Sequence, residues 1–471
     1  MSICECAILV TAKKVAEARG FAVTKMVTIE RPEYVQALMD ARMNGFVKVI
    51  TGIRRCGKSF LLDKLFRKRL EEDGVSQNQI ISVDLDDSKM KRLRDPLLLD
   101  EFLRDKITSG HGEQYVFIDE IQRTRKVLPP DVDLSRVAPE DREDAYVTFY
   151  DVLNGLRKLP NVDVYVTGSN SHTLSKDIAT NFRDRGVQIH LQPLSFAEYF
   201  ACSGATDKLE AFRRYLVWGG MPAAVLAKSD AQRASYLKGL FEEVYLKDIV
   251  ERHAIKDDIV LSSVIDILSS DVGSLTNPHK IGDTLNSRYR IHPSDHTLSA
   301  YLEHLTDAFL FTKTRRYDVK GRRYIDSPSK YYATDMGLRN ARINFRDADR
   351  SHPMENVIFN ELIRRGYSVD VGVVPIQVSV NGKRQMRQHE IDFIVNRGND
   401  KLYIQSALDL PSDQKREQET LPLRKSGDFF RKIVITEGYD QPLADNDGIL
   451  HIGVIPFLLD RTILDEILRK A

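Results

Sequence analysis

Gly52, Gly57, Lys58 and Ser59 occupy the fixed positions of the pattern G-x-x-x-x-G-K-S within residues 47–65. In this pattern, backbone N–H groups of the loop and of the following helix bind phosphate. The lysine reaches the β- and γ-phosphate oxygens, and the serine hydroxyl binds Mg²⁺. The candidate nucleotide-binding residues are therefore Gly52, Ile53, Arg54, Arg55, Cys56, Gly57, Lys58, Ser59 and Phe60.

An acidic pair, Asp119 and Glu120, ends the apolar run "YVFIDE". Ligands of an open α/β sheet bind where the parallel strands end, and two acids are costly to desolvate there unless they face a metal ion and water. We expect Asp119 to bind Mg²⁺ together with Ser59, and Glu120 to orient or deprotonate the attacking water, with Lys58 stabilising the phosphates. The alternative is an acidic strand end that points into solvent.

A third set of polar residues ends the stretch "VYVTGSN", after its apolar first half. Thr167, Ser169 and Asn170 offer side-chain hydrogen bonds towards a γ-phosphate or an attacking water. We predict a phosphate-sensing role for Asn170 because this set comes after the other two in the chain. The same four letters, T-G-S-N, are also typical of an ordinary turn.

The elements that must position these residues alternate between strands and helices. Val47, Val49 and Ile50 precede the phosphate loop as a buried strand should, and a helical apolar pattern follows Ser59. Further strands are predicted over 80–87, 115–122 and 162–170, with helices over 97–107 and 149–159 between them, and a polar surface loop over 123–144. The pattern indicates an α/β protein with the parallel sheet core of a P-loop NTPase.

The composition fits a soluble multidomain protein. The chain has 471 residues, of which 42% are hydrophobic and 29% charged, so two or three domains are expected. A net charge of +1 produces no overall field for nucleic acid or membrane, and any basic surface must be local. Because no apolar run is long enough to span a bilayer, we expect a cytoplasmic protein without a membrane partner.

Six motifs along the chain carry a resemblance to a known family. In order they are "GIRRCGKS", "FIDEIQ", "VTGSNSHTLSKDIATNFRDRG", "LQPLSFAEYF", "YLVWGGMPAAV" and "KYYATDMGLRNA". Together they resemble a prokaryotic family of AAA-type P-loop ATPases with a C-terminal domain of restriction-endonuclease-like fold, over residue 27 to the end. The resemblance implies ATP rather than GTP. It also gives Arg183 or Arg185, with Arg185 preferred, the role of an arginine finger in a neighbouring protomer or across a domain closure; a solvated turn is the alternative.

The expected domains follow from these patterns. Residues 1–25 are an N-terminal extension, residues 26–204 the ATPase core and residues 205–256 a helical lid. Residues 257–340 have the layout of a winged helix, with its third helix near 294–306, and residues 341–471 form the nuclease-like domain.

The hairpin of the winged-helix segment concentrates positive charge around Gly321. Its functional interpretation is duplex DNA binding through phosphates, centred on Arg315–Arg323; the alternative is a solvated basic hairpin in a module that contacts proteins. The cations are Arg315, Arg316, Lys320, Arg322, Arg323 and Lys330.

The nuclease-like segment lacks part of the expected metal site. Nucleases of this fold use a helix Glu, a strand Asp and an E-x-K on the next strand. Glu361 or Glu355, with Asp392, matches the first two, but the E-x-K positions read Gln405, Ser406 and Ala407. Because Mg²⁺ prefers anionic oxygens and the lysine is replaced, we predict an inactive, nuclease-shaped binding or assembly module.

Three functions remain open from the sequence. The leading one is an ATP-driven switch or motor whose C-terminal modules hold a partner; a homo-oligomer is one assembly open to it. The second is an ATP-dependent nuclease. The third is a nucleotide-gated binding module with negligible turnover, against which the presence of Glu120 argues.

Overall fold

The computed structural model describes residues 28–108, 112–168, 186–255, 257–346, 349–380, 383–438 and 442–469. Residues 1–30 cluster as one unit and residues 31–471 as another, and all elements below belong to the second unit. The expected N-terminal extension, residues 1–25, lies outside the described residues. Within the described ranges, no helix is both long enough and apolar enough to cross a bilayer.

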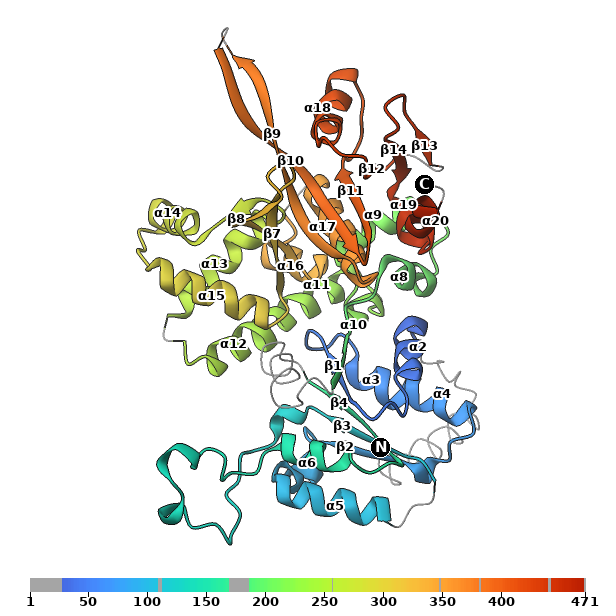
Figure 1. The fold of residues 1–471 in the computed structure, drawn as a ribbon, viewed down its shortest axis with the longest axis vertical. Helices are drawn as coiled ribbons and strands as arrows, with labels where there is room; N and C mark the ends of the chain where they lie inside the picture. Colours follow the sequence, from blue (N-terminus) through green and yellow to red (C-terminus); the bar gives the residue numbers. More distant parts are fainter. Residues whose placement is uncertain are drawn as a thin grey trace. The chain divides into compact units, whose positions relative to one another are not determined.

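The first sheet has five parallel strands in the order β2-β3-β4-β1-β5 (Figure 1). Strand β4 therefore lies between β1, which leads into the phosphate loop, and β3, which ends at the acidic pair. The α/β P-loop NTPase core predicted from the sequence is confirmed. Its strands are β1 (Val47–Thr51), β2 (Ile80–Asp84), β3 (Gln114–Asp119), β4 (Val162–Thr167) and β5 (Gly186–His190).

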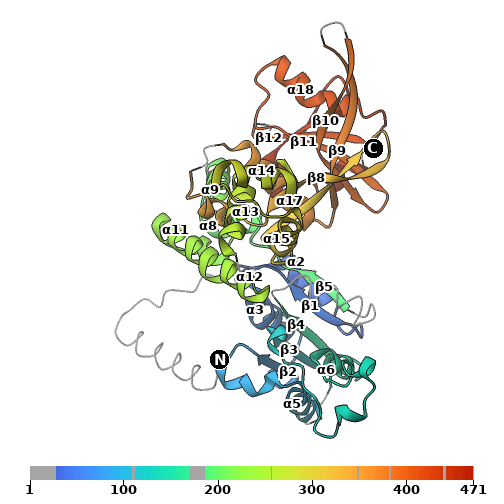
Figure 2. The same cartoon turned by 90° about the vertical axis from the view of Figure 1, so that its left-hand side faces the viewer.

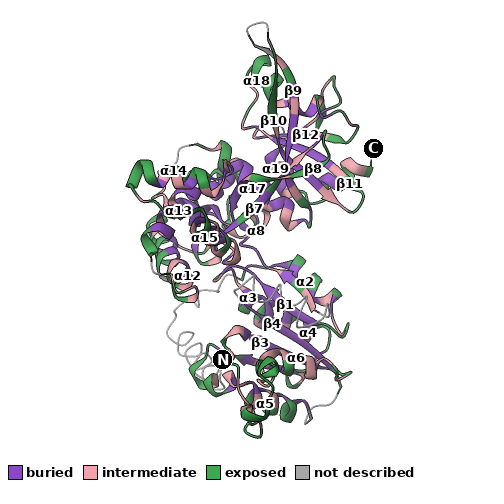
Figure 3. Cartoon of the chain, turned by 60° about the vertical axis from the view of Figure 1, so that its left-hand side comes forward, coloured by how far each residue is buried: buried purple, intermediate pink, exposed green. Residues whose placement is uncertain are grey.

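The central strands β1, β3 and β4 are buried on both faces and mostly apolar, and the buried Lys48 of β1 pairs with the buried Asp163 of β4. Figure 3 shows β1, β3 and β4 as buried. On one face Val116 and Ile118 pack with α5 (Pro96–Thr108) and α6 (Phe149–Leu156). On the other face Tyr115 and Phe117 pack with the helix that follows the phosphate loop.

The helix after the phosphate loop is continuous but not uniform. It begins as α3 (Lys58–Phe60), passes through the π-helical η1 (Leu61–Phe66) and ends as α4 (Arg67–Glu72). A further helix, α2 (Pro32–Asp40), begins with proline at its first position, which suits the missing N–H of that residue. Short 3₁₀ turns complete this region: η2 (Gln77–Gln79), η3 (Ser88–Arg94), η4 (Ile121–Arg123), η5 (Leu134–Arg136) and η6 (Pro139–Asp141).

A helical region follows β5. Its later helices share one apolar core with the phosphate-loop helix, because Leu237, Phe241 and Tyr245 cluster with Leu61 and Leu65. The helices are α8 (Phe196–Ser203), α9 (Lys208–Trp218), α10 (Pro222–Val225), α11 (Asp230–Gly239), the π-helical η7 (Leu240–Leu246) and α12 (Lys247–Arg252).

Three helices and a hairpin come next, and Figure 2 shows the helices grouped beside β8. The hairpin predicted around Gly321 is confirmed: β7 and β8 pair antiparallel, and the short β6 adds to the free edge of β8. The elements are α13 (Asp258–Ser270), β6 (Leu275–Thr276), α14 (Pro278–Tyr289), α15 (Asp295–Asp307), β7 (Phe311–Asp318), β8 (Arg323–Ala333) and α16 (Met336–Arg342).

This hairpin does not end as a free wing, because β7 also pairs with β9 and makes it part of a nine-stranded mixed sheet. The order is β13-β14-β12-β11-β10-β9-β7-β8-β6. In Figure 1 the long β9–β10 hairpin extends past the neighbouring strands. The remaining strands are β9 (Ser368–Val380), β10 (Lys383–Arg397), β11 (Asp400–Ser406), β12 (Arg431–Thr436), β13 (Leu443–Ala444) and β14 (Leu450–Gly453).

The two faces of the second sheet carry separate cores. One core joins Phe393 and Ile404 to α17 (Ser351–Arg364), α19 (Val454–Leu459) and α20 (Ile463–Arg469). The other, smaller core includes Tyr403, Ala407 and Leu423 and lies under α18 (Asp413–Arg424).

Candidate functional site

The phosphate loop leaves β1 through two glycines with positive φ. Gly52 has φ 146°, and a Cβ there would lie 2.2 Å from the carbonyl oxygen of Leu191. Gly57 has φ 104° and precedes α3 directly. Both positions require glycine, the first for space and backbone conformation and the second for conformation alone.

Lys58 lies over this loop with its side chain turned back. Its Nζ donates to the carbonyl oxygens of Gly52 at 3.0 Å and Ile53 at 3.2 Å, and the residue is buried. No ion pair of Lys58 is found among the described residues. A cation held by neutral carbonyl groups keeps its charge available for phosphate.

Thr167 joins the acidic pair to the neighbouring strand. Its hydroxyl donates to Oδ1 of Asp119 and accepts the backbone N–H of Glu120 at 3.0 Å. Sequence reasoning had placed this side chain towards a γ-phosphate, whereas here it fixes the two acids. It can do so because β4 lies next to β3 and both strands end at the same edge.

The Ser59 hydroxyl also lies close to Asp119, near enough to influence its pKa. Burial raises the pKa of the Asp119 carboxyl, against the lowering effect of the hydroxyls of Ser59 and Thr167. A hydroxyl and a carboxylate at one point are hard oxygen ligands that suit Mg²⁺, which takes its remaining ligands from phosphate and water.

Glu120 has φ 54° and ψ 49°, a left-handed conformation that is unfavourable for this residue type. Its carboxylate accepts a hydrogen bond from Gln122 and is only partly buried. Such strain is retained at functional sites, where it sets the direction of a side chain.

Two contacts of the phosphate loop could not be seen in the sequence. The Tyr245 hydroxyl donates to the carbonyl oxygen of Arg54 at 2.6 Å, and the Arg54 guanidinium pairs with Asp248 at 2.8 Å. The loop is therefore fixed by the helical region almost two hundred residues away in the chain.

Two side chains beside the loop have shifted pKa values. Burial raises the pKa of the Cys56 thiol, which contacts the carbonyl oxygen of Leu191, so this cysteine is protonated and poorly reactive. Burial, with Lys58 and Arg364 adding to it, lowers the pKa of His190 to about 4. No motif marks His190, which lies at the end of β5 beside the loop.

Three predicted catalytic residues, Asn170, Arg183 and Arg185, lie outside the described residues, as does Ser169. The other predicted residues of the site lie at one edge of the first sheet.

The second acidic site lies in the nine-stranded sheet and contains an unexpected cation. The Lys330 ammonium, from β8, lies 2.9 Å from Oε1 of Glu355, 2.6 Å from Oε1 of Glu390 and 3.8 Å from Oδ1 of Asp392. The Tyr332 hydroxyl donates to the same Glu355 oxygen at 2.7 Å. Lys330 was predicted to contribute to a basic surface, but it is only 4% exposed and pairs with the carboxylates of this cluster.

Of the two helix acids considered as the partner of Asp392, Glu355 is the one that lies near it. Glu355 lies next to Asp392, whereas Glu361 pairs with Arg365 at 2.8 Å and Arg364 at 3.4 Å on the other side of α17. Burial raises the pKa of Glu355, but Lys330 and hydrogen-bond donors outweigh it and bring the pKa to about 2. Burial and repulsion from Glu355 raise the pKa of Asp392.

The positions that replace E-x-K have structural contacts. Gln405 accepts the backbone N–H of Asp392 at 3.3 Å and donates to Glu419 at 3.0 Å. The Ser406 backbone N–H donates to Asp392 at 2.8 Å, and Ala407 lies in the smaller apolar core. Among the described residues, no three acids, histidines or cysteines are spaced to hold a metal ion.

The basic hairpin is only partly free. Arg316 is buried and donates to Gln388, and Lys320 donates to the carbonyl oxygen of Pro375. With Lys330 also buried, the exposed cations of the predicted set are Arg315, Lys320, Arg322 and Arg323. The expected phosphate contacts of this hairpin therefore fall from six to about four.

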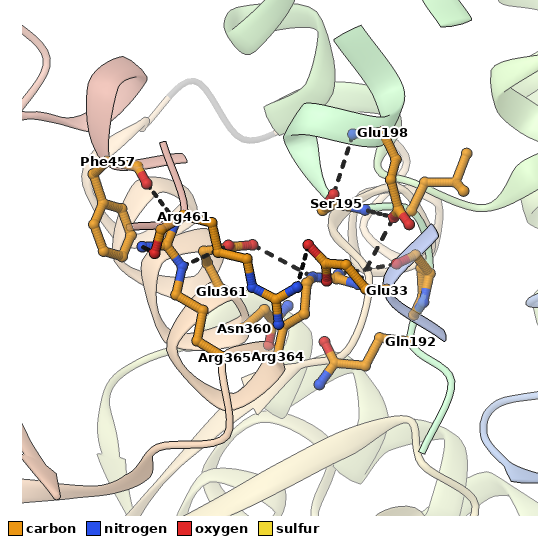
Figure 4. A network of polar contacts seen from close by, with 12 residues as sticks. Glu33, Gln192, Ser195, Glu198, Asn360, Glu361, Arg364, Arg365, Phe457 and Arg461 are labelled. Atoms are coloured by element: carbon orange, nitrogen blue, oxygen red, sulfur yellow. Dashed lines mark hydrogen bonds and ion pairs between the residues drawn. The ribbon is translucent and has the colours of Figure 1, made fainter. Parts of the chain in front are cut away.

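A buried charged network connects the first sheet to α17 (Figure 4). The segment after β5 accepts hydrogen bonds from two arginines: Arg31 at the Gln192 carbonyl, 2.8 Å, and Arg364 at the Pro193 carbonyl, 2.9 Å. Glu198 pairs with both, at 2.6 and 3.9 Å. The same segment begins at Leu191, against which Gly52 packs.

The motifs "WGGMP" and "TDMGL" meet at one carboxylate. Asp335 caps α16 by accepting the Leu338 N–H at 2.9 Å and also accepts the Gly220 N–H at 2.6 Å. A Cβ on Gly219 would lie 2.4 Å from Asp335, and one on Gly337 would lie 2.1 Å from the carbonyl oxygen of Trp218. Close packing, and not ligand chemistry, accounts for these glycines.

The comparisons agree with the first site. Residues 44–200 match the family model of an AAA domain, and residues 209–349 match that of a domain of unknown function. The fold and the phosphate-loop edge thus define a P-loop ATPase domain of the AAA type. An uncharacterized protein of Haemophilus influenzae is 34% identical over 92% of this chain and 98% of its own length. The chain belongs to the same family as that protein.

Two more distant similarities are found. An uncharacterized protein of Methanocaldococcus jannaschii is 24% identical over 87% of both chains. A Walker-type ATPase of Pyrococcus abyssi, a solved structure, is 16% identical with a TM-score of 0.45, over 67% of this chain and 96% of that one. This structural similarity is too low to support an argument about function.

Proposed function

We propose that the chain binds ATP with Mg²⁺ and hydrolyses it, and that it uses the cycle to change how its C-terminal part holds a partner. The observation that supports this most is the arrangement of Ser59, Asp119, Thr167 and Glu120 at one sheet edge beside Lys58. Lys58 binds the β- and γ-phosphates, and Ser59 with Asp119 holds Mg²⁺. Glu120 accepts the proton of the attacking water or orients it.

A short chain of contacts connects the phosphate loop to the C-terminal part. Leu191 lies against Gly52 of the loop, and the two residues that follow Leu191 accept the hydrogen bonds of Arg31 and Arg364. Arg364 ends α17, whose other end carries Glu355 in the Lys330 cluster. A shift of the loop on phosphate binding would therefore displace α17, which belongs to the core of the second sheet.

Hydrolysis is tested with two variants and two controls. Lys58→Ala should abolish ATP binding, and Glu120→Gln should retain binding while Mg²⁺-dependent phosphate release stops. Lys68→Ala and Glu140→Gln change exposed residues of the same types and should behave as the wild type. Hydrolysis by Glu120→Gln at the wild-type rate would show that the base is assigned wrongly. Binding without turnover in the wild type would favour a nucleotide-gated module.

We also propose that Arg185, with Arg183 as the alternative, completes a neighbouring protomer's site in a homo-oligomer. Gly186 pairs with Val47, the first residue of β1, whereas the phosphate loop follows its last residue. The described start of β5 therefore lies at the end of the sheet opposite to the phosphate loop, which supports action in trans. Mixing inactive Arg185→Ala with inactive Glu120→Gln should restore hydrolysis if the finger acts in trans.

For the C-terminal part we propose a winged helix joined to an inactive nuclease-like sheet. The order α13-β6-α14-α15-β7-β8, with β6 on β8, supports the first. Lys330 inside the Glu355–Asp392 cluster supports the second, because its ammonium already pairs with the carboxylates. We expect no cleavage of single- or double-stranded DNA with Mg²⁺ or Mn²⁺, with or without ATP. Cleavage that disappears in Asp392→Ala would instead establish an ATP-dependent nuclease.

Duplex DNA is a second candidate partner, supported by the exposure of Arg315, Arg322 and Arg323. If these three arginines contact phosphates, replacing them with alanine should lower the slope of log affinity against log salt by roughly 2.7. The absence of duplex binding by the wild type at low salt would leave protein contacts as the role of this hairpin.

A further inference from the structure

A cleft of about 490 Å³ lies on the nine-stranded sheet across β7, β8, β9, β10 and β11. It is not part of the phosphate-loop edge, and the proposed ATP cycle does not use it. The charged and aromatic residues that line it are Lys313, Arg315, Tyr317, Tyr324, Asp370 and Lys401.

The aromatic residues form a row with cations between them. Tyr317 and Tyr324 face each other across β7 and β8 with ring centroids 5.3 Å apart, at 70°. The Arg315 guanidinium lies 3.9 Å from the Tyr324 ring, and the Lys401 ammonium lies 5.6 Å from the Tyr317 ring and 4.9 Å from that of Phe430.

This row is accessible to a flat ligand. Tyr324 is 47% exposed and Phe430 is 41% exposed, although large aromatic side chains are usually more buried. A guanidinium stacked on an aromatic ring extends the platform, because its plane can stack a base as the ring does. The cleft thus offers stacking surface, which a site for inorganic phosphate alone does not need.

The charges of the cleft select an anion. Lys313, Arg315 and Lys401 are three cations, and Asp370 is the one acid among the lining residues. Asp370 is buried, accepts the Tyr324 hydroxyl at 3.1 Å and lies 4.0 Å from Arg315, so it holds the platform in place. An excess of two positive charges beside exposed aromatic rings fits bases joined by phosphates.

We propose that this cleft binds the nucleotides of a single-stranded nucleic acid. Bases stack on Arg315, Tyr324 and Tyr317, and Lys313 and Lys401 contact the phosphates. A duplex does not fit this chemistry, because its bases are already stacked on their neighbours and the platform could reach only the backbone.

The test uses the full-length protein and a fluorescein-labelled twelve-nucleotide oligothymidylate, followed by fluorescence anisotropy at low salt. Tyr324→Ala should weaken binding by about 5- to 150-fold, the effect of one lost stacking contact. Tyr324→Phe keeps the ring and should bind within about threefold of the wild type. Arg315→Ala should weaken binding and lower the salt slope by about 0.7.

Two exposed residues provide matched controls. Arg136 has an 87% exposed side chain in the segment between β3 and β4, and Tyr289 is 49% exposed on α14. Arg136→Ala and Tyr289→Ala should leave binding of the strand unchanged. If Arg136→Ala weakens it as much as Arg315→Ala does, the attraction is general charge and the proposal is wrong.

Binding of a duplex and of a free nucleotide is measured in the same way, to distinguish these ligands from a single strand. A twelve-base-pair duplex that binds as tightly as the strand, and is insensitive to Tyr324→Ala, would overturn the proposal. Thymidine monophosphate that competes for the cleft while the strand binds no more tightly would identify a free nucleotide as the ligand, with the same chemistry. No binding of either would overturn the proposal. Unchanged thermal unfolding of each variant excludes a folding defect.

Discussion

Each of the two sheets has acidic side chains close to a lysine, but the partners of those groups differ. At the first sheet, the Thr167 hydroxyl donates to Asp119, and the Lys58 ammonium donates to neutral carbonyls. At the second sheet, Lys330 lies directly between Glu355 and Asp392. Opposite charges that are kept apart remain available to a metal ion and phosphate, whereas paired charges neutralise each other. The same residue types thus have separated charges in one sheet and paired charges in the other.

The largest expected effect is a difference in ATP hydrolysis between variants of Asp119, in the first sheet, and of Asp392, in the second. Asp119→Asn should lower the rate of Mg²⁺-dependent ATP hydrolysis by roughly two to three orders of magnitude, because an amide replaces the anionic oxygen beside Ser59. Asp392→Asn should leave hydrolysis within about twofold of the wild type. The measurement is steady-state phosphate release with each variant shown to be folded. Equal loss in both variants would mean that the second cluster also serves ATP hydrolysis.

Lys330→Met should have the next largest effect, on stability. Removing the ammonium leaves buried carboxylates without their counter-ion, which typically costs about 3–5 kcal/mol of the free energy of unfolding. The double variant Lys330→Met/Glu355→Gln should recover part of this loss because it also removes one of the charges. Denaturant unfolding measures both, with Lys425→Met as the control at an exposed lysine. A loss in the double variant that equals or exceeds that of Lys330→Met would contradict the pairing.

Thr167→Val should give a smaller change in stability but a clear change in activity. The substitution preserves shape and leaves the Glu120 N–H and an Asp119 oxygen without their partner, at a cost of about 1–3 kcal/mol. Hydrolysis should fall as well, since both acids lose their orientation. Thr436, also buried at a strand end, belongs to the second sheet, and its hydroxyl has no hydrogen-bond partner within the described residues. Thr436→Val should therefore be neutral or stabilising, and an equal loss at both sites would show that the Thr167 contacts are unimportant.

The sequence predicted the first site better than the second for a physical reason. The phosphate loop is one contiguous segment, and parallel strands bring Asp119 and Thr167 to the edge at which it begins, so local pattern and topology suffice. The second site depends on a lysine from β8 that reaches acids on α17 and β10. Its burial follows from the pairing of β7 with β9, which no local pattern in the hairpin indicates. The basic residues around Gly321 were therefore all predicted to lie on the surface.

The contacts of the loop with Tyr245 and Asp248 were not predictable either. They join residues almost two hundred positions apart, and neither side chain belongs to a motif. By contrast, a hairpin with Gly321 near its tip was predicted, and the helix α15 was predicted nearly to its ends, because turn residues and apolar spacing mark them locally.

The smallest expected effect is a pH dependence of stability caused by His190, which lies close to the Lys58 ammonium. Burial, with Lys58 and Arg364 adding to it, brings the pKa of His190 to about 4, whereas an unfolded histidine titrates near 6.5. Between these values the unfolded state binds more protons than the folded state, so the free energy of unfolding should fall as pH is lowered from about 6.5 towards 4. His190→Gln should flatten this dependence, measured by urea unfolding at several pH values, whereas His279→Gln on the exposed face of α14 should not. Bound ATP adds negative charge next to Lys58 and should raise the pKa of His190, so saturating nucleotide should also flatten the wild-type dependence. A wild-type dependence that is equally steep with and without nucleotide would mean that His190 does not sense the charge of the phosphate site.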